Sequence, residues 1–151
     1  ATILSQGDSS RLYQSLVYKK QLAQSASADA DTREDNGLFT ARAVMASGKK
    51  TEDGIAALRE EIAALAAKPV TAAELDKAKN LIITSALRER ETNDGKAAAL
   101  GEAVTQNHDA TYVNRGLARL QAVTAADVQR VVRKYLIDGK AVVITYTSEA
   151  K

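Results

Sequence analysis

The first residue to weigh as a source of chemistry is a histidine. His108 is the only imidazole among 151 residues, and the chain contains no cysteine. A tight metal site in a cysteine-free protein normally needs several imidazoles or a cluster of carboxylates around one. His108 stands beside Asp109 in a polar stretch. We interpret it as a solvated loop residue, with a transient metal contact as the alternative, and predict no metal ligand and no catalytic residue in this chain.

A second candidate is the segment Gly7-Asp8-Ser9-Ser10, which resembles the opening of one esterase family. A nucleophilic serine needs a base within hydrogen-bond reach and a group that orients the base. His108 lies about a hundred residues further on and lacks the aspartate three positions before it that such enzymes carry. We expect the polar segment to cap a helix. An esterase that acts through Ser9 is a minor alternative.

Charged residues gather at several further places, but their spacing does not build a site. The acidic pairs are Glu60 with Glu61 and Glu89 with Glu91, and the basic groups are Lys19 with Lys20 and Arg130 with Arg133 and Lys134. Neighbouring residues of a helix point about 100° apart, so an adjacent pair of acids does not form a dyad. No aromatic residues interleave with the basic ones as nucleic-acid binding would require. We interpret these charges as solvated surface and predict no nucleic-acid partner.

Composition narrows the class of protein further. A chain of 151 residues with 45% hydrophobic residues is the size of one domain, and its net charge of +2 provides no broad electrostatic field. The eight glycines form no phosphate-binding motif, so no nucleotide cofactor is expected. No apolar run approaches the roughly 20 residues of a membrane span. The opening Ala-Thr-Ile-Leu resembles the end of an apolar element, so we expect a fragment truncated at its N-terminus.

The first third of the chain predicts a helix and a hairpin. Apolar residues recur at helical spacing over residues 9–20, and small residues alternate with polar ones from Ala23 to Ala30. Asn36-Gly37 favours a reversal, after which a second strand begins at Leu38 and the hairpin ends at Gly48. The expected inward faces hold Ala26, Ala28 and Ala30 on one strand and Phe39, Ala41, Ala43 and Met45 on the other.

A run of helices follows, with expected starts at Thr51, Thr71, Ala97, Tyr112 and Thr124. Thr71 and Glu74 have the spacing of a capping box, in which each side chain accepts a hydrogen bond from a free backbone N–H group. Pro69 is expected to close the first helix, and Asn93-Asp94-Gly95 to break the second. Gly139 should stop the last helix.

The end of the chain, Ala141 to Thr147, is apolar and β-branched enough to predict a buried strand. Helices grouped between strands indicate an α+β fold, with a mostly antiparallel sheet packed against a layer of helices. We interpret residues 1–151 as a single, partial domain. Three strands make a thin sheet, and its exposed edge is expected to promote self-association of the isolated chain.

Several stretches taken in order resemble the insulinase/pitrilysin-type zinc metallopeptidase family. They are Asp8–Ser25, Asn36–Phe39, Pro69–Leu75 with Ala78–Asn80, Arg88–Glu91, Gln121–Val128 and Lys134–Leu136. The resemblance spans nearly the whole chain, and the ordered combination is more specific than any one stretch. It implies a peptidase built from repeated α+β domains, arranged as two halves around a closed chamber.

The resemblance also implies which kind of domain this is. In the family, one domain carries a His-x-x-Glu-His helix that holds zinc, and a chain with one histidine has no such motif. The non-catalytic half usually offers an Arg and a Tyr seven positions apart, whereas the corresponding positions here hold Val17 and Gln24. The match is therefore to a non-catalytic C-terminal domain, the second domain of the zinc-bearing half. We carry over no catalytic residue, and the substrate-binding residues are unknown.

For function, the resemblance implies a wall domain of a peptide-degrading chamber, without hydrolysis by this chain alone. Zinc is expected in a catalytic domain of the same polypeptide or of a partner subunit, and peptides are the expected substrate. The alternative is a structural or assembly module on the same fold, without peptidase activity. The family's habits suggest the bacterial periplasm or cell envelope.

Overall fold

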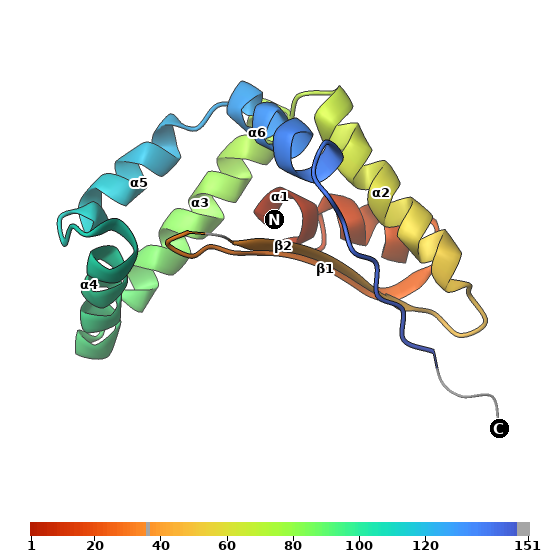
Figure 1. The fold of residues 1–151 in the computed structure, drawn as a ribbon, viewed down its shortest axis with the longest axis horizontal. Helices are drawn as coiled ribbons and strands as arrows, with labels where there is room; N and C mark the ends of the chain where they lie inside the picture. Colours follow the sequence, from red (N-terminus) through yellow and green to blue (C-terminus); the bar gives the residue numbers. More distant parts are fainter. Residues whose placement is uncertain (36, 148–151) are drawn as a thin grey trace.

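The computed structural model describes residues 1–35 and 37–147. In chain order its elements are α1 (Thr2–Ser5), η1 (Tyr13–Lys19), β1 (Ala23–Asp31), β2 (Leu38–Met45), α2 (Thr51–Ala67), α3 (Ala72–Glu89), α4 (Asn93–Asn107), α5 (Tyr112–Ala122), α6 (Ala125–Val131) and η2 (Val132–Ile137). The elements η1 and η2 are π-helical. Figure 1 shows an arch of helices on one side of an antiparallel hairpin. The predicted α+β class is confirmed.

The hairpin has an inward face made largely of alanine. Its register pairs Ala26 with Ala43, Ala28 with Ala41 and Ala30 with Phe39, as the alternation in the sequence predicts. Along β2, exposed and partly buried residues alternate. Small side chains on this face let the helices lie close to the sheet. The predicted reversal at Asn36-Gly37 falls partly outside the described residues, because Asn36 is not among them.

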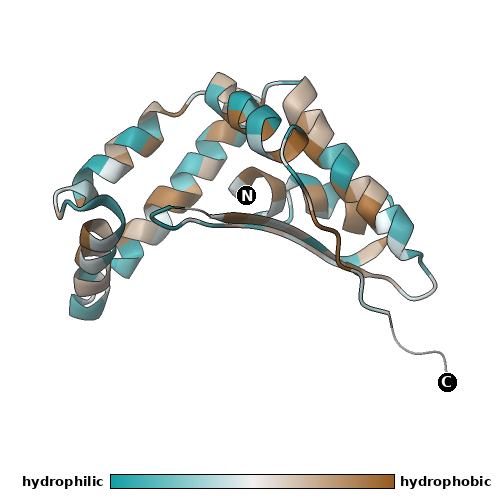
Figure 2. Ribbon diagram, in the orientation of Figure 1, coloured by the Kyte–Doolittle hydropathy of each residue, from teal (hydrophilic) through white to brown (hydrophobic). Residues whose placement is uncertain are grey.

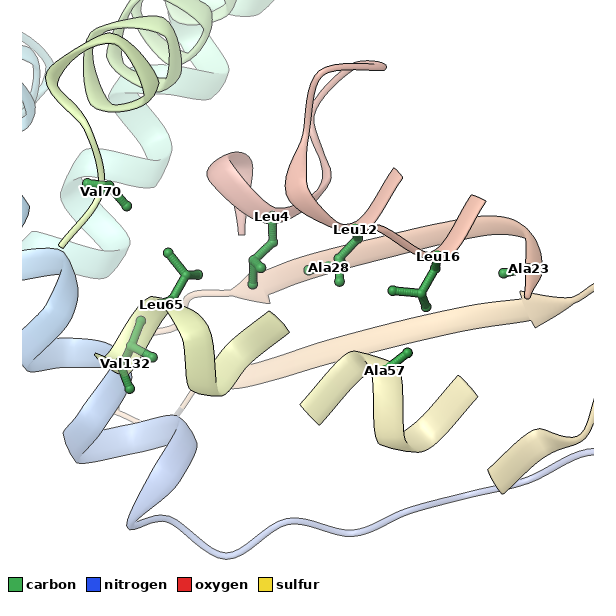
Figure 3. Packing of buried hydrophobic residues seen from close by; sticks show 10 residues of the cluster. Leu4, Leu12, Leu16, Ala23, Ala28, Ala57, Leu65, Val70 and Val132 are labelled. Carbon is green, nitrogen blue, oxygen red and sulfur yellow. The ribbon is translucent and has the colours of Figure 1, made fainter. Parts of the chain in front are cut away.

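The core forms where leucines of the first helical turns meet this alanine face. Leu4, Leu12 and Leu16 are the largest fully buried side chains, and they cluster with Ala28. Ala57, Leu65 and Val132 join the cluster from other helices, and Val70 joins it from the α2–α3 connection (Figure 3). An isolated two-stranded hairpin is marginal in water. Packing against these leucines is therefore what keeps β1 and β2 folded.

Side-chain capping fixes where α3, α4 and α6 begin. Thr71 with Glu74 and Thr124 with Asp127 both form complete capping boxes, which confirms the predicted starts of α3 and α6. At α2 the cap position is held by Lys50, no side-chain cap hydrogen bond forms, and Thr51 is the first helical residue.

The break after α3 also differs from the prediction. Asn93-Asp94-Gly95 does not end a helix but forms the first turn of α4. Thr92 causes the difference, since its Oγ1 accepts a hydrogen bond from Gly95 N at 3.0 Å and caps that turn. The interruption therefore falls at residues 90–92.

Two predicted α-helical segments contain wide π-helical turns. In the first, Lys20 N donates to Ser15 O at 2.9 Å, and in the last, Asp138 N donates to Arg133 O at 3.0 Å. Each of these hydrogen bonds joins residues five positions apart, whereas α-helical bonds join residues four positions apart. Hydrophobic spacing predicted the helices correctly but carries no signal for this change of hydrogen bonding.

The predicted buried strand at Ala141–Thr147 is wrong. Residues 141–147 form no strand, and Val142, Ile144 and Tyr146 are 88%, 69% and 89% exposed. The apolar segment runs outside the helical layer (Figure 2). A strand needs a neighbour for its backbone groups, and the described sheet contains β1 and β2 alone. Composition favoured a strand, but no described strand pairs with it.

The contrast between core and terminal segment gives a stability prediction. Leu16→Ala should lower the free energy of unfolding by about 2–5 kcal/mol, because it leaves a cavity against the alanine face. Ile144→Ala should change it by no more than about 0.5 kcal/mol, because its side chain is already in solvent. Urea unfolding measures both. Equal losses would show that residues 141–147 pack against the folded chain.

Candidate functional site

His108 is exposed, as predicted, and it joins two distant segments. It ends α4 in the left-handed conformation, with φ of 52°. Its Nε2 lies 2.8 Å from Glu34 Oε1, near the end of β1. Asp109, its neighbour in sequence, instead accepts hydrogen bonds from Thr111 and pairs with Arg115. His108 therefore connects the α4–α5 loop to the hairpin.

This arrangement does not fit a zinc centre. In the described ranges, no group of three or more His, Cys, Asp or Glu side chains is placed to hold a metal ion. Among these residues Glu34 alone meets the imidazole, whereas a tight zinc site takes three or four protein ligands.

Ser9 meets a lysine rather than a histidine. Lys77 Nζ donates a hydrogen bond to Ser9 Oγ and another, of 3.3 Å, to Gln6 O. Within the described residues no hydrogen bond joins Ser9 to His108, so the serine–histidine arrangement of the esterase family is not formed. No pattern in the sequence indicates Lys77 here, because the two residues are 68 positions apart.

The predicted capping role of residues 8–10 is also wrong. The helical turns begin at Arg11, and among the described residues no hydrogen bond joins the side chain of Asp8, Ser9 or Ser10 to a backbone N–H group there. Ser10 is 3% exposed, and its Oγ has no hydrogen-bond partner among the described residues. Buried hydroxyl groups are usually paired. Ser10 therefore presents an unused polar group inside the protein.

A bidentate ion pair fixes this polar loop against α3. Arg11 Nε and Nη2 donate to the two Glu74 carboxylate oxygens at 2.8 and 3.2 Å. Thr71 N and Oγ1 also donate to Glu74 Oε2, each at 3.0 Å. The hydrogen bond from Arg11 is the main cause that lowers the pKa of Glu74 to about 2, with smaller contributions from Thr71. Glu74 therefore stays ionised at neutral pH, and Arg11 balances its negative charge.

The remaining charged candidates are dispersed over the surface. Their contacts are Glu60 with Lys20, Glu89 with Ser85, Arg130 with Asp127, Arg133 with Ala66 O and Lys134 with the Tyr135 ring. Glu61 lies on α2, whereas Glu91 lies in the turn between α3 and α4. No shared acidic or basic site results from these positions.

The two positions that match the family's Arg and Tyr have different surroundings in this structure. Val17 packs against the core cluster, and Gln24 is exposed on β1. The hairpin itself leaves one face open, since the helices lie on its other side (Figure 1). Neither outer edge pairs with another strand in the described sheet. This open hairpin is the geometric candidate for contact with an extended chain.

A comparison with models of known protein families identifies the family of this chain. The model of the peptidase M16 inactive domain matches residues 1–82, which is more than half of the chain. The chain belongs to this family. The predicted resemblance is thereby confirmed, and so is its assignment to an inactive domain of zinc-protease type.

Solved structures agree over most of the chain. A "putative zinc protease" of Bordetella pertussis Tohama I is 28% identical, with a TM-score of 0.80, over 90% of this chain and 74% of that one. The inactive peptidase domain of such a protease from Bordetella parapertussis is 27% identical, with a TM-score of 0.81, over 90% and 72% of the two chains.

A protease of Helicobacter pylori is 25% identical, with a TM-score of 0.81, over 89% of this chain but only 32% of its own length. This inactive domain therefore spans about a third of that longer protein. A search of curated sequences finds no match. Among the described helices, none has the length and apolar character needed to cross a bilayer.

The Arg11–Glu74 pair predicts a pH dependence of stability. Because folding lowers the pKa of Glu74 from 4.5 to about 2, its contribution is present above pH 4.5 and is lost as the pH falls towards 2. Glu74→Gln should cost about 1 kcal/mol at neutral pH, a value discounted for partial exposure. Urea unfolding at descending pH should show the two proteins converging. Glu60→Gln is the exposed control, and a gap that stays constant down to pH 2 would contradict the electrostatic explanation.

Proposed function

We propose that this chain is a non-catalytic wall domain of a zinc-dependent peptidase, and that it helps to enclose a chamber for peptides. Hydrolysis is assigned to a zinc-bearing domain in the same polypeptide or in a partner subunit. The observation that carries the proposal is membership of the inactive-domain family in a chain whose single imidazole contacts Glu34. The domain contributes shape and contact surface, and the partner contributes the chemistry.

The hairpin gives this role a physical basis. An extended peptide can add to a free sheet edge through backbone hydrogen bonds, with alternate side chains giving selectivity. The uncovered face of β2 presents Leu38, Thr40, Arg42 and Val44, which are exposed. Most segments of a folded protein are not extended and free to pair with such an edge. The surface therefore favours unfolded peptides.

Reconstitution with the catalytic domain tests the proposal. The partner is the polypeptide region or neighbouring gene product that contains His-x-x-Glu-His. The purified chain alone should lose zinc on dialysis and leave an unfolded peptide intact, whereas the combined proteins should cleave it. The matched control replaces the motif Glu of the partner by Gln.

Two outcomes would contradict the proposal. Stoichiometric zinc in the dialysed chain together with unaided cleavage would make it an enzyme by itself. Absence of the motif from both the polypeptide and its neighbours would favour the structural or assembly module on the same fold.

Self-association of the isolated chain is a separate prediction. Val142, Ile144 and Tyr146 are exposed in a segment without charged residues, and such surfaces associate unless they are covered. Sedimentation should show a dimer or larger species at high concentration. Ile144→Lys should shift the population towards monomer. A wild-type chain that stays monomeric at all concentrations would refute this prediction.

A further inference from the structure

A groove runs between α1 and α3, away from the open face of the hairpin. It consists of a cavity of about 280 Å³ and a neighbouring hollow of about 20 Å³, both of which Thr2 and Leu81 line. One stripe of α3 lines its length at positions 74, 77, 78, 81, 82, 85, 86 and 89. Spacings of three and one repeat along this stripe, so the groove follows a single helical face.

The middle of the groove is apolar and open to solvent. Leu81 and Ile82 are 38% and 39% exposed there, and Ala86 continues the same surface. Large hydrophobic side chains exposed next to a cavity favour an apolar ligand group. The cavity volume lies at the lower end of the range for ligand pockets, so it accommodates side chains rather than a whole peptide.

One end of the groove offers hydrogen-bond donors to an anion. An ammonium group has three donors, and Lys77 uses two of them on Gln6 O and Ser9 Oγ. Lys77 forms no ion pair within residues 1–35 and 37–147. Ser9 and Ser10 also line the smaller hollow beside it, where the Ser10 hydroxyl is buried and the Ser9 hydroxyl meets Lys77. Glu74, also in the lining, is already compensated by Arg11.

The opposite end carries the opposite charge. Glu89 lines the larger cavity, accepts a hydrogen bond from Ser85 Oγ at 2.9 Å and has no cationic partner in the described part of the chain. Twelve residues of helix separate it from Lys77, which corresponds to about 18 Å along α3. Five residues of extended chain span about the same length.

We propose that the α1–α3 groove binds a short peptide with free ends. Its terminal carboxylate lies at Lys77 and the Ser9 hydroxyl, its apolar side chains pack on Leu81 and Ile82, and its terminal ammonium lies at Glu89. Charge complementarity at both ends selects this occupant. The inference rests on the proposed function, because a peptide-degrading assembly releases short peptides with newly formed termini.

The test is a titration of the full chain with the pentapeptide Gly-Ala-Leu-Ala-Leu, followed by backbone amide shifts in NMR. Binding should move the resonances of α1, residues 7–10 and α3. Amidation of the peptide's C-terminus and the variant Lys77→Gln should each weaken binding about tenfold, because each removes a charge-assisted contact. Acetylation of its N-terminus and Glu89→Gln should act in the same direction at the other end.

Lys96→Gln is the matched control, because Lys96 is an exposed lysine on α4 outside the groove. It should leave the affinity unchanged. Equal affinities for the free and amidated peptides, or shifts centred on β1 and β2, would overturn the proposed groove. No zinc-bearing partner is present in this titration. If the peptide does not bind here but reconstitution restores cleavage, only the proposed binding groove is refuted. If the peptide binds here but reconstitution gives no cleavage, only the proposed role in a chamber is refuted.

Discussion

The contact between a few leucines and an alanine-faced hairpin is the constraint on which the rest of the structure depends. A two-stranded sheet buries too little to stay folded in water. Leu4, Leu12 and Leu16 are fully buried against it, and Ala28 gives them room to approach. Because the helices that pack on the hairpin lie on one side of it, the sheet is stabilised through one face only (Figure 1). Its other face and its edges stay accessible, so the same packing that makes the fold stable also exposes the hairpin.

A second constraint positions the polar loop. Residues 7–10 lack a side-chain cap for the following helix, and the Arg11–Glu74 pair fixes the loop to α3 instead. Glu74 is at the same time the capping residue of α3, so one carboxylate secures both a helix start and a loop. Lys77 lies one turn further along α3 and reaches Ser9. The α1–α3 groove is therefore a consequence of how the first helical segment is attached.

Features set by neighbours in sequence were predictable. The capping boxes at Thr71 and Thr124 and the alanine alternation of the hairpin each depend on residues within a few positions. Contacts across the chain were not predictable, since Arg11 and Glu74 are 63 positions apart and no periodicity links them. At residues 141–147 the sequence predicted a structure that does not form. Their composition suits a strand, but strand formation is decided by a partner, and local sequence carries no information about one.

His108 has a structural part in positioning the α4–α5 pair. Packing does little for the α4–α5 pair, because Ala103 is the one buried residue of α4 and α5 has none. Polar links hold the pair to the remainder instead: His108 to Glu34, and Lys79 Nζ to Gln121 O at 2.7 Å. Regions with few buried contacts open at lower free energy than a core does. The α4–α5 pair is therefore the part of the domain that is free to adjust, while the leucine-covered hairpin keeps its shape.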